Sequence, residues 1–280
     1  MSVETTGVET EVPQSAFLRI ATIVLGALIA LAGIAWGADL YRMVGWTFLT
    51  EQFLATVLGL SLALVFLNRP FNRNAPGPRR LPWYDAILAL VSLGAGVYAT
   101  LRYPDILSNF FMQPLDGEIV SWLLFVLVIE GLRRTAGWSL VVVVLAFTGY
   151  ALVGHLVEGD LQTNEVALND LVFYLGVDTS GLFGIVLLVG VTVVIPFIFF
   201  GNLLQASGGS FFFNDLALGA MGRYRGGSAK ISILASTLFG SISGIVVSNI
   251  LATGVITIPM MKKSGFKPEQ AAAIEASASN

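Results

Sequence analysis

Long apolar stretches without lysine or arginine constrain this chain more than any other feature. They occupy residues 141–157, 185–200 and 231–261. An α-helix needs roughly 20 apolar residues to cross the ~30 Å hydrocarbon core of a bilayer, whereas barrel strands need only about ten alternating residues. The chain is also 55% hydrophobic and only 12% charged, which is far from the composition of a soluble domain. The sequence therefore predicts an all-α, polytopic membrane protein.

Apolar runs bounded by charges, proline or glycine predict about six transmembrane helices. We expect them at residues 17–36, 46–67, 83–101, 118–132, 138–157 and 181–201. Residues 1–16 contain three glutamates and no basic residue, which is unlike a secretory signal, so they predict a disordered cytoplasmic tail. Because the chain has no cysteine, disulfides and thiolate metal sites are excluded.

The distribution of basic residues predicts the orientation. The loop 68–82 contains four arginines, whereas the loop 158–180 contains five acidic residues and no basic one. Lysine and arginine accumulate in cytoplasmic loops of membrane proteins. We therefore expect a multi-pass protein of the inner (cytoplasmic) membrane with its N-terminus in the cytoplasm.

A cluster of small polar residues, GSISGIVVSN at 240–249, interrupts the last apolar stretch. If residues 231–260 crossed the membrane, ten of the 15 basic residues would be cytoplasmic; if they entered and returned, 13 would be cytoplasmic. The second arrangement obeys the charge rule better, so we predict a re-entrant helical hairpin with this cluster at its tip. The two glycines also have the spacing of a GxxxG packing contact between helices, and this alternative stays open.

Polar groups at the predicted tip indicate an ion or substrate site. Irregular backbone at membrane depth is tolerated where it meets protein or a water-filled cavity, and broken helices form the sites of secondary transporters. Hydroxyl, amide and carbonyl oxygens suit Na⁺, whereas free backbone N–H groups suit a carboxylate. The candidate residues are Ser241, Ser243, Gly244, Ser248 and Asn249. Of these, Ser243 and Asn249 would hold Na⁺.

Glu275 lies roughly two turns into a helix that begins near Pro268. Acidic residues inside a membrane are functional by default, so Glu275 is a candidate for carrying a coupling proton or for lying near the cation site. An interfacial glutamate reached by cytoplasmic water is the alternative. Glu275, Ser279 and Asn280 are also candidates for lining a second wall of the site, opposite the hairpin tip. Upstream, the segment 211–225 has one apolar face and predicts an interfacial helix.

Residues 222–280 resemble the first hairpin region of the large membrane subunit of TRAP transporters, the tripartite ATP-independent periplasmic carriers. The markers are Arg-Gly-Gly before the hairpin, Ser-x-Ser-Gly at its tip, Ile-Pro-Met followed by basic residues, and an alanine-rich helix. Residues 173–204 are similar to the preceding span, and residues 17–135 resemble the small membrane subunit as four helices. With Glu275 in the alanine-rich helix, the layout resembles fused permeases that pair with TAXI-type solute-binding proteins.

This resemblance implies that residues 136–280 are the N-terminal part of a transport domain. It also implies an ion-coupled secondary transporter that imports organic acids of the dicarboxylate kind, delivered by a periplasmic solute-binding protein, with Na⁺ or H⁺ as coupling ion. We expect no enzymatic activity and no nucleic-acid partner, because no catalytic or phosphate-binding motif or basic nucleic-acid patch appears.

Two departures from the family pattern affect these expectations. Ile245 follows Ser243-Gly244 where the family usually continues Ser-Gly-Ser, and the chain stops at Asn280 before the family's second repeat. We therefore expect a truncated permease with about half a site. The alternative function is a non-transporting membrane scaffold or an inactive permease fragment.

Overall fold

The computed structural model describes residues 16–71, 82–157, 159, 161–244 and 246–280. Within these ranges, six side chains are not described: Phe17, Ser210, Ser243, Val247, Ser248 and Leu251. The predicted tail falls outside the described residues except for Ala16, where the first helix begins. Every regular element in the described ranges is helical, which confirms the predicted all-α class.

The chain divides into two compact units, residues 1–191 and 192–280, and each is described by itself. The division at residue 191 reflects which parts of the chain contact one another. The boundary that we expect between residues 135 and 136 concerns the resemblance to two fused subunits and stays a prediction.

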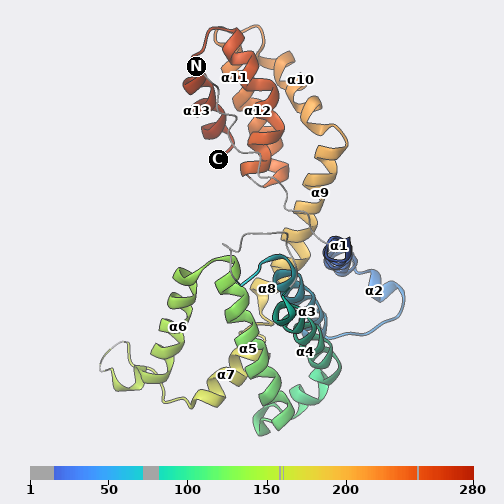
Figure 1. The fold of residues 1–280 in the computed structure, drawn as a ribbon, viewed down its shortest axis with the longest axis vertical. Helices are drawn as coiled ribbons and strands as arrows, with labels where there is room; N and C mark the ends of the chain where they lie inside the picture. Colours follow the sequence, from blue (N-terminus) through green and yellow to red (C-terminus); the bar gives the residue numbers. More distant parts are fainter. Residues whose placement is uncertain (1–15, 72–81, 158, 160, 245) are drawn as a thin grey trace. The chain divides into compact units, whose positions relative to one another are not determined.

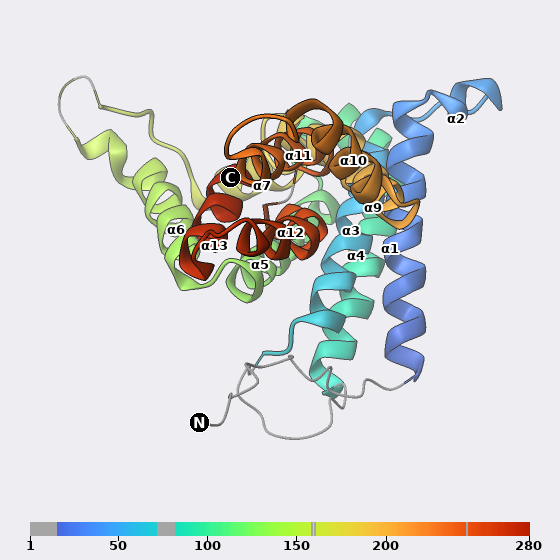
Figure 2. The same cartoon turned by 90° about the horizontal axis from the view of Figure 1, so that it is seen from above.

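The first unit contains eight α-helices and two short 3₁₀ turns within its described residues. Their bounds are α1 Ala16–Gly37, α2 Leu40–Met43, α3 Thr50–Asn68, α4 Trp83–Ser108, η1 Phe110–Met112, α5 Leu115–Thr135, α6 Trp138–Val153, η2 Gly154–Leu156, α7 Leu168–Val177 and α8 Ile185–Val189. Figure 2 shows α1, α3 and α4 lying side by side.

Small residues allow α3 and α4 to pack closely. A Cβ added to Gly59 would lie 2.9 Å from Gly96 Cα, and the reverse substitution would bring a Cβ within 2.8 Å of Gly59 Cα. Helices in membranes associate through such small-residue contacts because lipid tails offer no hydrophobic driving force. Hydrogen bonds add to the contact, since Gln52 Nε2 donates to Thr100 O (2.8 Å) and the Thr56 and Thr100 hydroxyls lie 2.8 Å apart.

A buried ion pair joins α4 to α5. Arg134 donates to Asp85 Oδ1 (2.6 Å) and to the backbone carbonyl of Arg69 (3.0 Å). Arg134 also pairs with Glu130 (2.6 Å), and Arg133 pairs with the same carboxylate (2.7 Å). These contacts join α4, α5 and the end of α3 and satisfy charges that would otherwise be costly to bury.

Five helical segments among the described residues are long and apolar enough to cross a membrane. They are α1, α3, α4, α6 continued by η2 (Trp138–Leu156) and the run Ile185–Ala206. The remaining predicted span, 118–132, lies within α5, which has 21 residues but carries acidic residues in its first turn and arginines in its last. The number and positions of these helices agree with a polytopic membrane protein.

The second unit is a cluster of helices that follows a π-helical segment, η3 Gly190–Val194. Its helices are α9 Ile195–Ala206, α10 Gly209–Met221, α11 Gly227–Ser243, α12 Val246–Lys263 and α13 Pro268–Ala278. In Figure 1, α11 and α12 run side by side with α10 and α13 packed against them. Helix α10 covers residues 211–221 of the segment 211–225 predicted as an interfacial helix, and residues 222–225 follow it as a turn. Its position in a membrane stays a prediction.

A left-handed glycine separates α11 from α12. Gly244 has φ 62° and caps the C-terminus of α11, where its N–H donates a hydrogen bond to the carbonyl of Gly240. A residue without a Cβ adopts this conformation without strain. The two helices have 17 and 18 residues, so the structure contains the helical pair that the sequence predicts. Its re-entry into the membrane remains a prediction.

Candidate functional site

The side chain of Glu275 is enclosed by four hydroxyl groups about half-way along α11 and α12. Glu275 Oε2 accepts hydrogen bonds from Ser232 Oγ and Thr257 Oγ1, each at 2.5 Å. Its Oε1 accepts from Ser236 Oγ at 2.8 Å and from Thr253 Oγ1 at 2.5 Å. All five residues are fully buried. We call this group the hydroxyl cage.

Helical spacing explains why the four hydroxyls converge. Ser232 and Ser236 are four residues apart on α11, and Thr253 and Thr257 are four residues apart on α12. Residues i and i+4 lie on one face of a helix, one above the other. Each helix therefore presents two hydroxyls to α13.

Small residues let α13 approach these two faces. A Cβ added to Gly254 on α12 would lie 3.2 Å from Glu275 Cγ and 3.6 Å from its Cδ. Ala271, one turn before Glu275, is fully buried as well. Alanine and glycine at these positions keep the three helices close enough for the carboxylate to reach both hydroxyl pairs.

The cage matches the hydrogen-bonding capacity of an ionised carboxylate. A carboxylate offers about four lone-pair positions, and four hydroxyls occupy them here. None of the ion pairs among the described residues involves Glu275. The negative charge would thus be stabilised by neutral donors, since hydrogen bonds to charged groups contribute about 1.5–3 kcal/mol each.

The same cage can accommodate a protonated Glu275. Thr253 Oγ1 lies 2.9 Å from the carbonyl of Asn249, and Thr257 Oγ1 lies 3.1 Å from the carbonyl of Thr253. Either threonine can turn its single proton to that carbonyl and accept a hydrogen bond from the carboxylic acid instead. The geometry therefore leaves no buried oxygen of Glu275 unpaired in either protonation state.

Asn249 adds a second polar feature next to the cage. Its Nδ2 donates to the carbonyl of Ser236 at 2.9 Å and thereby joins the first turn of α12 to α11. Its Oδ1 is buried without a hydrogen-bond partner among the described residues. Gly240 gives the amide its space, because a Cβ there would lie 2.8 Å from Asn249 Nδ2. Gly240 is thus a packing glycine within α11, and only Gly244 forms the turn.

The other predicted site residues lie in different environments. Ser241 is exposed, and its hydroxyl donates to the carbonyl of Leu238. The side chains of Ser243 and Ser248 lie outside the described part of the chain. Ser279 is buried, with its hydroxyl 3.5 Å from that of Ser236. Asn280 is exposed. The structure thus brings Asn249, Ser279 and Glu275 into contact with one residue, Ser236.

The four hydroxyl residues of the cage were not among the site residues predicted from the sequence. Each is an ordinary residue in a helix, where serine and threonine commonly bond to the backbone of the preceding turn. A usable signal was present: two hydroxyl pairs with i, i+4 spacing on consecutive helices, followed by Glu275 in an alanine-rich helix.

Comparison with known proteins identifies the family. The profile described as "Tripartite ATP-independent periplasmic transporter, DctM component" matches residues 123–280, which is more than half of the chain. The chain belongs to the DctM family. This confirms the resemblance to the large membrane subunit of TRAP transporters that was stated for the hairpin region, and the description of the family is that of a transporter component.

Two curated relatives share segments of the DctM chain. Uncharacterized protein YgiK of Salmonella typhimurium is 39% identical over 97 residues, which cover 34% of this chain and 21% of that protein. Uncharacterized protein y4mL of Sinorhizobium fredii is 44% identical over 59 residues, which cover 21% of this chain and 14% of that protein. The matches therefore span about a fifth or less of these relatives' length. No solved structure matches the chain.

Proposed function

We propose that this DctM chain belongs to an ion-coupled importer of organic acids and that Glu275 is its coupling group. The observation that carries the proposal is the hydroxyl cage, in which a fully buried carboxylate has four hydroxyl donors and no basic partner among the described ion pairs. Buried acids without a basic partner are expensive and mark proton or ion pathways in membrane proteins.

A proton is the coupling ion that the cage supports best. The carboxylate has all its acceptor positions filled by hydroxyls, and the two threonines can instead donate to backbone carbonyls when Glu275 is protonated. Because three helices enclose Glu275, its proton exchanges with water only when these helices separate. Protonation would thus be linked to the opening of the α11–α12 pair.

The substrate and the partner follow from the family resemblance. TRAP permeases receive their substrate from a periplasmic solute-binding protein, and we propose one of the TAXI type here. The substrate class would be organic acids such as dicarboxylates. We further propose that the protein lies in the inner membrane with its N-terminus in the cytoplasm and that α11 and α12 form a re-entrant hairpin, in agreement with the basic loops.

The test is the exchange Glu275→Gln, measured with the transporter as encoded and its binding protein in proteoliposomes. A proton carrier should lose gradient-driven accumulation of labelled substrate but retain exchange of substrate across the membrane. Glu269→Gln is the matched control, because Glu269 is exposed on the same helix. Accumulation at the wild-type level in Glu275→Gln would refute the role of Glu275. A complete lack of uptake in the wild type would favour the scaffold alternative.

A Na⁺ site near the hairpin tip is a second candidate, favoured by the unpartnered Oδ1 of Asn249. Amide oxygens are suitable ligands for hard cations. In this case Asn249→Ala and Ser243→Ala should weaken the Na⁺ dependence of uptake more than they weaken docking of the binding protein. Unchanged Na⁺ activation curves in both variants would eliminate the Na⁺ site and leave the proton.

A further inference from the structure

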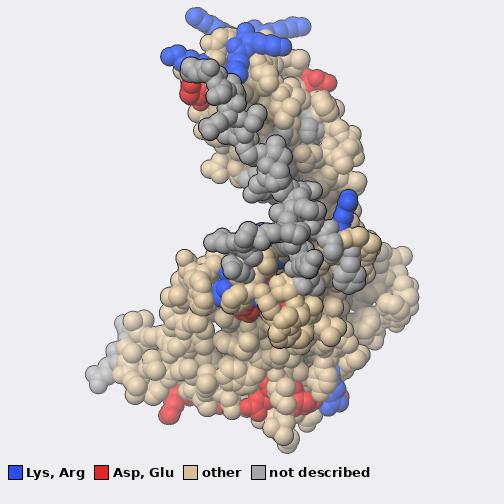
Figure 3. Space-filling model, viewed as in Figure 1, with Lys and Arg blue, Asp and Glu red and all other residues tan. Residues whose placement is uncertain are grey.

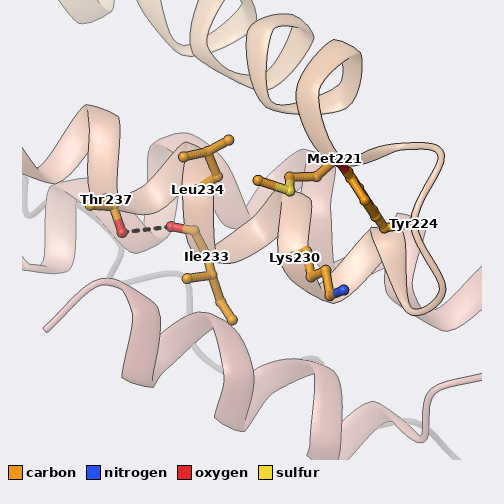
Figure 4. Close-up of a pocket in the computed structure, with 6 residues that line it drawn as sticks. All are labelled: Met221, Tyr224, Lys230, Ile233, Leu234 and Thr237. Carbon is orange, nitrogen blue, oxygen red and sulfur yellow. Dashed lines mark hydrogen bonds between the residues drawn. The ribbon is translucent and has the colours of Figure 1, made fainter.

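A pocket of about 430 Å³ opens on the second unit, away from the hydroxyl cage. Its size lies in the range of ~300–1,000 Å³ that is common for ligand sites. The lining residues come from the end of α10, the following loop and α11: Met221, Tyr224, Lys230, Ile233, Leu234 and Thr237. Figure 4 shows Tyr224 and Lys230 at one end of this group and Thr237 at the other.

The α11 wall of the pocket is a single stripe with two apolar residues between Lys230 at one end and Thr237 at the other. Lys230, Ile233, Leu234 and Thr237 follow the spacing i, i+3, i+4, i+7, so they lie on one helix face. The Thr237 hydroxyl donates to the carbonyl of Ile233 at 2.8 Å, which occupies its proton within the helix. Beyond Lys230, the stripe therefore offers little for a polar ligand to bind.

The charged end of the pocket lies in a basic surface. Between residues 222 and 270 the chain has six basic residues and one acidic residue, Glu269. Because α11 and α12 are antiparallel neighbours, the start of α11 and the end of α12 lie at the same end of the unit, and Figure 3 shows the basic side chains gathered there. The basic residues are Arg223, Arg225, Lys230, Lys262, Lys263 and Lys267.

We propose that this pocket binds an anionic phospholipid. The phosphate would contact Lys230, whose Nζ lies 5.4 Å from the centre of the Tyr224 ring. One acyl chain would follow the apolar stripe over Ile233 and Leu234 toward Thr237. The charge complementarity supports this occupant, since basic pockets beside membrane helices bind anionic head groups and lysine contributes through both its charge and its apolar stem.

This inference stands independently of the proposed transport function. The lipid would hold the α10–α11 connection at the membrane surface, so it would act on the same helix that carries two of the cage hydroxyls. It requires neither a particular substrate nor a particular coupling ion.

Native mass spectrometry of the purified 280-residue chain tests the proposal, with phosphatidylglycerol and phosphatidylcholine of equal chain length as probes. We expect the complex with phosphatidylglycerol to survive gas-phase activation in the spectrometer better than the complex with phosphatidylcholine. Lys230→Gln should weaken phosphatidylglycerol binding about fivefold, the effect of one basic residue near an anionic lipid. Lys262→Gln is the matched control, because it removes the same charge from the same basic end without lining the pocket.

Two further measurements distinguish the pocket from a diffuse basic surface. Ile233→Gln places a polar group in the apolar stripe and should also weaken phosphatidylglycerol binding, while sn-glycerol 3-phosphate alone should not compete. Equal losses for Lys230→Gln and Lys262→Gln would overturn the proposal in favour of a diffuse charge effect. Equal binding of the two lipids, or competition by glycerol 3-phosphate, would overturn it as well.

Discussion

Removing one hydroxyl from the cage should increase the local opening of α12 and α13. Removing an exposed hydroxyl outside the cage should not. Thr257→Val keeps the shape of the side chain but deletes the donor to Glu275 Oε2. A hydrogen bond to a charged group contributes about 1.5–3 kcal/mol, and each 1.4 kcal/mol is a factor of ten in an equilibrium. The opening equilibrium of these helices should therefore rise roughly 10- to 150-fold.

Hydrogen exchange measured by mass spectrometry reports this opening on peptides from α12 and α13. Thr237→Val is the matched control, because its hydroxyl is exposed and donates to the carbonyl of Ile233 in its own helix. We expect that control to change exchange by less than about threefold, since exposed substitutions usually stay within ±0.5 kcal/mol. Equal changes in the two variants would refute the reasoning about the cage.

The same experiment in a Glu275→Gln background shows whether the contribution of Thr257 depends on the charge of Glu275. A bond to a neutral group contributes only about 0.5–1.5 kcal/mol, so Thr257→Val should cost about 1 kcal/mol less when Glu275 is already glutamine. The difference between the two backgrounds is the coupling energy of the pair. No coupling would show that Glu275 is already neutral in the wild type.

Two other substitutions test contacts outside the carboxylate itself. Gly240→Ala should push the amide of Asn249 out of place, because the new Cβ would lie 2.8 Å from its Nδ2. We expect the free energy of local opening to fall by about 1–3 kcal/mol, which hydrogen exchange would detect as faster exchange in α11. Arg134→Gln should destabilise the first unit by about 3–5 kcal/mol, because it leaves Asp85 buried without its cation; a thermal unfolding midpoint close to the wild type would contradict this.

Sequence patterns predicted the long apolar helices and a break within the cluster 240–249, where the structure has it at Gly244, because both have local causes. Apolar length determines which segments can cross a bilayer, and a glycine such as Gly244 adopts the left-handed conformation that ends a helix without strain. The role of Gly240 was not predictable, since GxxxG spacing does not show whether a glycine forms a turn or receives a neighbouring side chain.

The i, i+4 spacing of the two hydroxyl pairs is visible in the sequence, but their contacts with Glu275 could not be predicted because they depend on three helices meeting. Ser232 is separated from Glu275 by 43 residues, and no local pattern indicates that their side chains touch. The pair Arg134–Asp85, 49 residues apart, has the same character. Glu275 could nevertheless be singled out from the sequence, because it lies about two turns into an alanine-rich helix, where an ionised carboxylate inside a membrane would be costly.

Infrared difference spectroscopy can follow the protonation of Glu275 itself. Substrate-loaded binding protein would be added to the transporter as encoded, in liposomes, and the carbonyl stretch of a protonated carboxylic acid would be recorded. If Glu275 carries the coupling proton, a band in this region should change on substrate addition and should be absent from Glu275→Gln, while Glu269→Gln retains it. The same band in the Glu275→Gln protein, or no carboxylic-acid band in the wild type, would contradict proton coupling through the hydroxyl cage.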